Sequence, residues 1–174
     1  IAQLTRENVS SVNQDGEPLG DEQNNLFQGE LVKSQVRYKK EFEQIDGKLI
    51  TIWLKSVVKN ENKSIGKISV IFVDDNYLLD VNIKYLKHNY FTDIITFNYN
   101  QGLNISGDLY ISIDTIKSNA EFYQTNFKNE LLRVIVHGVL HLLGYNDSNE
   151  SEQIIMRDKE DFYLNRLFND RTEI

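Results

Sequence analysis

Apolar and polar positions divide most of this chain into segments with strand-like or helix-like periodicity. Two segments alternate with period two and two others are short apolar runs rich in β-branched and aromatic residues, both typical of strands. Five further segments repeat apolar residues at helical spacing. The predicted strands are residues 32–40, 67–73, 92–99 and 107–113, and the predicted helices are 49–58, 76–86, 115–120, 128–143 and 150–167. About four strands and five helices in this mixed order predict an α+β fold, with helices packed against a mixed sheet.

The first thirty residues follow neither periodicity. They hold the single proline and scattered apolar residues among Asn, Gln, Asp and Glu, a composition that cannot offset its ordering entropy by burial. We therefore expect residues 1–30 to be a flexible or loosely packed extension and residues 31–174 to form one domain. A chain of 174 residues is consistent with a single domain.

Composition restricts the possible chemistry. The chain has no cysteine, which excludes disulfide frameworks, thiolate metal sites and a cysteine nucleophile, so any metal must bind His, Asp or Glu. A formal net charge of -7 argues against general coating of nucleic acid and restricts any such contact to a local basic region. The longest apolar stretch, 134–143, is well short of the roughly 20 residues that span a bilayer. We expect a cytoplasmic protein that does not contact a membrane, since no signal segment is evident.

Candidate chemistry concentrates in the helix at 128–143. His137 and His141 lie one turn apart on the same helix face, a separation that suits two ligands of one metal ion. Gly144 stands where a left-handed helix end is expected, and Asp147 follows closely enough for its carboxylate to return to the same ion. Two histidines and one carboxylate, with a fourth position left to water, are typical of a catalytic zinc site.

Two other interpretations compete with this one. An HxxxH pair taken alone is more often two ordinary histidines on a partly buried helix face. A metalloprotease of the HExxH type needs Glu immediately after the first histidine, and this chain has Gly138 there. Hydrolysis of a peptide or small ester is therefore disfavoured.

Three blocks of the sequence resemble, in order and spacing, the signature of the YbeY family of bacterial metal-dependent endoribonucleases. They are TDIITF at 92–97, GDLYIS at 107–112 and HGVLHLLGY at 137–145, the last preceded by ELLR at 130–133. The resemblance covers about residues 31–167. It implies a single-strand-specific endoribonuclease that acts in ribosomal RNA processing and ribosome maturation, hydrolyses phosphodiester bonds with a metal-activated water, and has RNA and ribosomal subunit proteins as partners.

Carried over by residue, the resemblance makes His137 and His141 the first two metal ligands. The third family ligand is usually His, and here it is Asp147. A carboxylate reduces the Lewis acidity of the ion and tolerates harder metals, so the identity of one divalent ion per chain, with Zn²⁺ as first choice, stays open. Family members also commonly place an Arg where this chain has Leu86, which leaves Lys84 and Lys87 as candidate phosphate contacts.

Two further residues have a functional and a plainer interpretation each. Arg133 lies one turn before His137, where it would contact substrate phosphate or form an i,i+3 pair with Glu130. Asp108 begins a predicted strand and would orient a ligand histidine from behind, or cap the start of the strand. No catalytic residue beyond the metal ligands and their water is indicated.

A second hypothesis on function comes from another class of protein. Leu86, which stands where an Arg is usual, and the net negative charge favour a ribosome-associated assembly factor with a structural metal and little catalysis.

Overall fold

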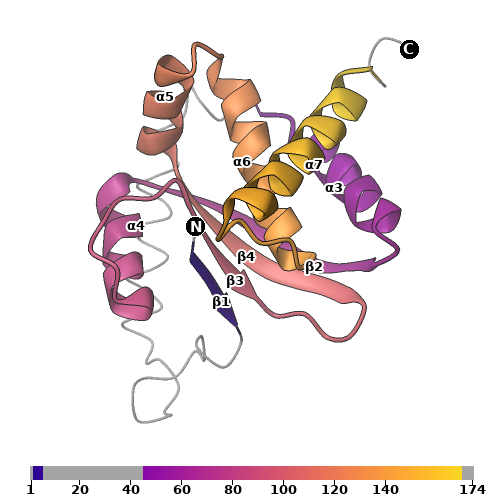
Figure 1. Cartoon of the computed structure of the whole chain (residues 1–174), viewed down its shortest axis with the longest axis horizontal. Coiled ribbons are helices and arrows are strands. Elements are labelled where there is room, and N and C mark those ends of the chain that lie inside the picture. The colour runs from indigo at the N-terminus through magenta and orange to yellow at the C-terminus, as the bar shows by residue number, and fades with distance from the viewer. Residues whose placement is uncertain (1, 6–44, 170–174) are drawn as a thin grey trace.

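The computed structural model describes residues 2–5 and 45–169, and these form a mixed sheet with helices on both faces (Figure 1). Its strands are β1 (Ala2–Thr5), β2 (Ser64–Val73), β3 (Ile94–Asn98) and β4 (Asn104–Ser112). Its helices are α3 (Gly47–Asn60), α4 (Asp75–Val81), α5 (Ile113–Phe122), α6 (Phe127–Leu142) and α7 (Glu150–Asn169), with a π-helical turn, η2 (Asn82–Leu86), that continues α4. The predicted strand at 32–40 lies outside the described residues.

The sheet combines both strand directions. Within the described ranges its order is β1-β3-β4-β2, where β3 pairs antiparallel with β4 and the two outer pairings are parallel. The α+β class and the mixed sheet predicted from the sequence are confirmed. β1 lies within the segment that the sequence predicts to be an extension, and it supplies four residues that pair with β3.

Alternation along the strands separates two hydrophobic cores. Ile94, Leu109 and Ile111 face one side of the sheet, where they pack with the buried faces of α3, α6 and α7. Ile95 and Phe97 face the other side and pack with α4 and η2. Figure 1 shows α6 and α7 in front of the sheet and α4 at its left. We call these the α6 face and the α4 face.

Polar side chains cap the starts of α4 and α5. Asp74 accepts from the amide of Tyr77, and Ser112 accepts from that of Thr115. Asp75 and Asp114 follow in the first turns of these helices, where a carboxylate is stabilised by the helix dipole. No helix among the described residues is both long and apolar enough to cross a membrane.

Candidate metal centre

Helix α6 places both histidines at its buried end. The side chain of Asn126 caps its first turn by accepting from the amide of Asn129 at 2.8 Å, and the helix then runs unbroken through His137 and His141. The two rings lie with centroids 4.6 Å apart. Their side chains are 11% and 2% exposed, so the pair lies under the surface while His137 keeps a narrow access to solvent.

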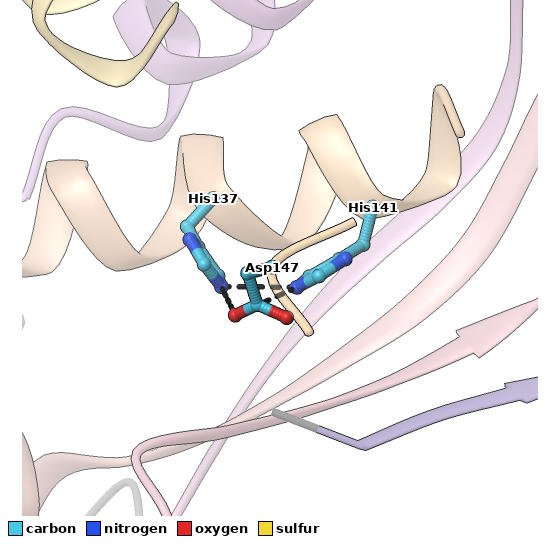
Figure 2. Close-up of side chains that lie close together, drawn as sticks. All are labelled: His137, His141 and Asp147. Atoms are coloured by element: carbon cyan, nitrogen blue, oxygen red, sulfur yellow. Dashed lines mark hydrogen bonds and ion pairs between the residues drawn. The ribbon is translucent and has the colours of Figure 1, made fainter. Parts of the chain in front are cut away.

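Gly144 turns the chain back toward these rings. Its φ of 100° is in the left-handed region, and its amide donates to the carbonyl of His141 while the amide of Tyr145 donates to that of Leu140. These two bonds form a Schellman motif, which ends the helix and reverses the chain. Asp147 is thereby carried under the histidines, as Figure 2 shows.

Three ligand atoms converge at this place. The Nε2 atoms of His137 and His141 are 3.0 Å apart, and Oδ2 of Asp147 lies 3.7 and 3.8 Å from them. In the part of the chain that the structure describes, these residues are the group of possible ligands whose atoms all lie within 4.8 Å of one another. A zinc ion with bonds of about 2.0–2.1 Å in tetrahedral geometry holds two nitrogens about 3.3 Å apart, which is close to the observed separation.

The hydrogen bonds of the outer ring nitrogens show which form of each imidazole is present. Nδ1 of His137 lies 2.6 Å from Oε1 of Glu160, and Nδ1 of His141 lies 2.9 Å from the carbonyl oxygen of Tyr145. A carboxylate and a carbonyl accept hydrogen bonds, so each Nδ1 carries a proton, and the neutral form of each ring then has its lone pair on Nε2. Burial lowers the pKa of His141 to about 4, which keeps its ring neutral at pH 7.

When both rings are neutral, the two Nε2 lone pairs face each other across 3.0 Å and repel one another. A cation held between them and the carboxylate of Asp147 removes this repulsion, so the donor set fits a divalent metal ion. Three protein ligands leave a position open for water or substrate, as in catalytic zinc sites.

Gly138 lets α6 approach the sheet closely between the two histidines. A Cβ at this position would lie 2.6 Å from Cδ1 of Ile94 and 2.9 Å from Cδ2 of Leu109. The glutamate of an HExxH motif therefore does not fit here without displacing core side chains. The close packing of α6 on the sheet thus gives a physical reason why this chain lacks the glutamate that serves as general base in HExxH metalloproteases.

Arg133 pairs with two carboxylates of α7 in place of the i,i+3 partner Glu130 that the sequence suggested. Its guanidinium donates to Oε2 of Glu160 at 3.0 Å and to Oδ1 of Asp161 at 2.7 Å, both on α7. Glu130 is instead buried, and burial raises the pKa of its carboxyl group. The i,i+3 pair is thus replaced by partners 27 and 28 residues away, which helical spacing alone could not reveal.

The expected orienting role of Asp108 is not what the structure shows. Asp108 alternates with Leu109 along β4, so it points to the α4 face, where it accepts from the hydroxyl of Tyr99 at 3.3 Å. Glu160 occupies the orienting position behind His137. Sequence reasoning missed Glu160 because it lies 23 residues further along the chain, in a helix that looks like a solvated charged face.

Lys84 and Lys87 lie on or just after η2, whose apolar side chains pack on the α4 face. Both are exposed: Nζ of Lys84 is 5.0 Å from the centroid of the Tyr85 ring, and Nζ of Lys87 donates to the carbonyl of Lys84. Neither contact joins them to the histidine cluster. Asp93 is a further carboxylate near the cluster: it is partly buried, it lies within electrostatic reach of His137, and burial raises its pKa.

The fold and the cluster define an α+β protein with a His₂Asp candidate metal centre at the end of a buried helix. The sequence profile described as Endoribonuclease YbeY matches residues 32–168, and the chain belongs to the YbeY family. The resemblance found in the three sequence blocks is therefore confirmed.

Curated relatives and a solved structure agree with this assignment. The Endoribonuclease YbeY of Flavobacterium psychrophilum is 49% identical over 116 residues, which cover 67% of this chain and 82% of that protein. The Endoribonuclease YbeY of Amoebophilus asiaticus is 46% identical over 132 residues, 74% of this chain and 90% of that protein. The solution structure of TM1509 from Thermotoga maritima superimposes with a TM-score of 0.55 at 25% identity, covering 75% of this chain and 89% of that one.

Proposed function

We propose that this chain is a metal-dependent endoribonuclease that cleaves single-stranded RNA during ribosomal RNA processing in the cytoplasm. The observation that carries the proposal is the convergence of two Nε2 lone pairs and the carboxylate of Asp147, with both Nδ1 atoms engaged elsewhere. The names of the relatives support RNA as the substrate. Residues 31–174 form the functional domain in this proposal, in line with a family match that begins at residue 32, and residues 1–30 form an extension that adds strand β1 to the edge of its sheet.

His137, His141 and Asp147 would hold one divalent ion, with zinc proposed from the two nitrogen donors. When bound, such an ion supplies a Lewis acid for a phosphoryl oxygen and lowers the pKa of water to near neutrality. Asp147 has the most exposed side chain of the three, 21% against 11% and 2%, so substrate approaches from its side. The face of α6 around Gly138 packs against Ile94 and Leu109 of the sheet.

The negatively charged RNA backbone has to be bound by basic side chains that are accessible to solvent. Arg133 is engaged by two carboxylates, whereas Lys84 and Lys87 are exposed. We assign these two lysines the phosphate contacts. Because each phosphate contact releases counterions from the RNA, binding should weaken as salt concentration rises.

One observation favours a second candidate function, that of a ribosome-associated assembly factor with a structural metal. Leu86 stands where an Arg is usual in the family, and its side chain packs against the core of the α4 face. The site consequently lacks a bidentate cation at this position. In this case ribosomal subunit proteins would be the principal partners.

The two functions separate in a cleavage assay. The full chain, loaded with one equivalent of Zn²⁺, is incubated with end-labelled single-stranded RNA beside a His137→Ala variant and a His88→Ala control. His88 is a suitable control because it hydrogen-bonds to Tyr90 in a loop and is no part of the cluster. We expect chelator-sensitive cleavage by the wild type and His88→Ala, and none by His137→Ala. Equal cleavage by all three would contradict the proposal, and co-sedimentation with ribosomal subunits that survives His141→Ala without any cleavage would favour the assembly factor.

A further inference from the structure

Glu160 is a buried carboxylate whose two oxygens have different partners. Its side chain is only 10% exposed, Oε1 lies 2.6 Å from Nδ1 of His137, and Oε2 accepts from the guanidinium of Arg133 at 3.0 Å. A buried carboxylate is destabilising unless it is paired and hydrogen-bonded. This pairing therefore holds Glu160 in one place. The position of Glu160 in turn determines which ring nitrogen of His137 carries the proton.

The consequence for His137 follows from the two nitrogens of its ring. With Nδ1–H donating to Glu160, the lone pair lies on Nε2 and points toward His141 and Asp147. Without an acceptor at Nδ1, the proton can move to Nε2, or the ring can rotate about its bond to the chain. In either case Nε2 is no longer available as a ligand in this geometry.

His141 is oriented by different means. Its Nδ1 donates to the backbone carbonyl of Tyr145, so no side-chain substitution removes this acceptor directly. The hydroxyl of Tyr145 donates to Glu61 at 2.7 Å, and Glu61 also accepts from Lys159 at 2.7 Å. Of the two histidines, His137 is thus the one whose Nδ1 hydrogen bond goes to a side chain, that of Glu160.

We propose that Arg133 and Glu160 are a positioning pair, through which α7 fixes the tautomer and the ring orientation of His137 for metal binding. Arg133 acts on the site through Glu160, so in this assignment it does not contact RNA. The inference rests on the proposed function only in taking His137 as a metal ligand. It needs no statement about which bond the protein cleaves.

The test measures zinc affinity of the full chain by competition with a chromophoric chelator, in the absence of RNA. Glu160→Gln keeps the size of the side chain but replaces the carboxylate between Arg133 and Nδ1 of His137 with a neutral amide. We expect it to weaken zinc binding about 10-fold to 100-fold, the usual range for an outer partner of a ligand histidine. Asp161→Asn is the matched control, because it removes the other carboxylate on Arg133 without touching His137. We expect its zinc affinity to stay within about threefold of wild type, since an ion pair at the surface contributes little.

A second readout follows the imidazole itself. Nitrogen NMR of the metal-free protein should show His137 protonated at Nδ1 in the wild type and in Asp161→Asn, and a mixture of tautomers in Glu160→Gln. A purely structural role of Glu160 would lower the unfolding temperature without this change. Unaltered tautomer and zinc affinity in Glu160→Gln would overturn the proposal.

Arg133→Met provides an independent variant should Glu160→Gln not fold. We expect it to weaken zinc binding on its own; where Glu160→Gln does fold, the two effects should be less than additive, because both act through one carboxylate. Unchanged zinc affinity together with weaker RNA binding would instead show that Arg133 contacts the RNA. That result would overturn the proposal that Arg133 and Glu160 position His137. A wild type that binds zinc but leaves RNA uncut would contradict the proposed function alone, since these affinities are measured without RNA.

Discussion

The two faces of the sheet use polar residues in different ways. On the α6 face, histidines and carboxylates converge beneath a helix, and the hydrogen bonds of His137 and His141 lead to α7 and to the turn after α6. On the α4 face, aromatic rings dominate: Phe97 packs edge-on against Tyr110 at 5.2 Å and against Tyr85 at 5.9 Å. Adjacent residues of one strand therefore lie in different chemical environments. A residue next to a motif in the sequence does not have to lie in the metal centre.

The largest expected difference between the faces concerns metal binding. His141→Ala removes a ligand itself, so zinc affinity should fall by more than the roughly 100-fold attributed to outer partners. Elemental analysis of the purified full chain should find about one equivalent of zinc in the wild type and almost none in the variant. A variant that retains a full equivalent would show that the cluster is not the metal site.

Close packing between α6 and the sheet should have the next largest effect. Gly138→Glu forces a Cβ against Ile94 and Leu109 and buries a charge, so we expect a loss of about 3 kcal/mol or more in unfolding free energy. Gly138→Ala serves as the smaller control, because the better helix propensity of Ala offsets part of the overpacking. Urea denaturation followed by circular dichroism measures both. Peptidase activity in a folded Gly138→Glu protein would contradict the packing argument.

The chain reversal after α6 should contribute less. Gly144 has a φ of 100°, and a residue with a side chain is strained there by about 1–2 kcal/mol. Gly144→Ala should lower the unfolding free energy by about this amount and also weaken zinc binding, since Asp147 depends on this turn. Gly102→Ala, at a φ of 58° in the β3–β4 connection, is the matched control. It should have a similar effect on stability with unchanged zinc affinity.

Charges on η2 should affect RNA alone. Neutralising Lys84 and Lys87 together, each to Gln, should leave zinc affinity unchanged. It should reduce the slope of log affinity against log salt by about one for each phosphate that the two lysines bind in the wild type. Fluorescence anisotropy with a short single-stranded RNA at several salt concentrations measures this slope. An unaltered slope would show that Lys84 and Lys87 do not contact the RNA phosphates.

The smallest effect is expected at Asp108. Asp108→Asn keeps a side chain that can accept from Tyr99, so its unfolding free energy should change by less than about 1 kcal/mol. Its zinc affinity should equal that of the wild type, in contrast to Glu160→Gln. A clear loss of zinc binding would show that the α4 face supports the metal centre after all.

Local patterns were sufficient for much of the fold. Strands β2, β3 and β4 and the five α-helices of the described residues lie within predicted segments or overlap them, because burial imposes a period of 2 or 3.6 on neighbouring residues. At the start of α7 the amide of Glu152 donates to Oδ1 of Asn149, a local contact between residues three positions apart.

By itself, the sequence determined the candidate ligands: His137 and His141 are one turn apart in any α-helix, and Gly144 reverses the chain locally, so Asp147 returns to them. Only the tertiary structure decided what lies behind those ligands. Glu160 reaches His137, and Arg133 reaches Glu160, because α7 packs on α6, and Gly138 is required because α6 lies on β3 and β4. Such contacts join residues more than 20 positions apart, and their geometry depends on how whole elements pack, which short-range periodicity does not encode.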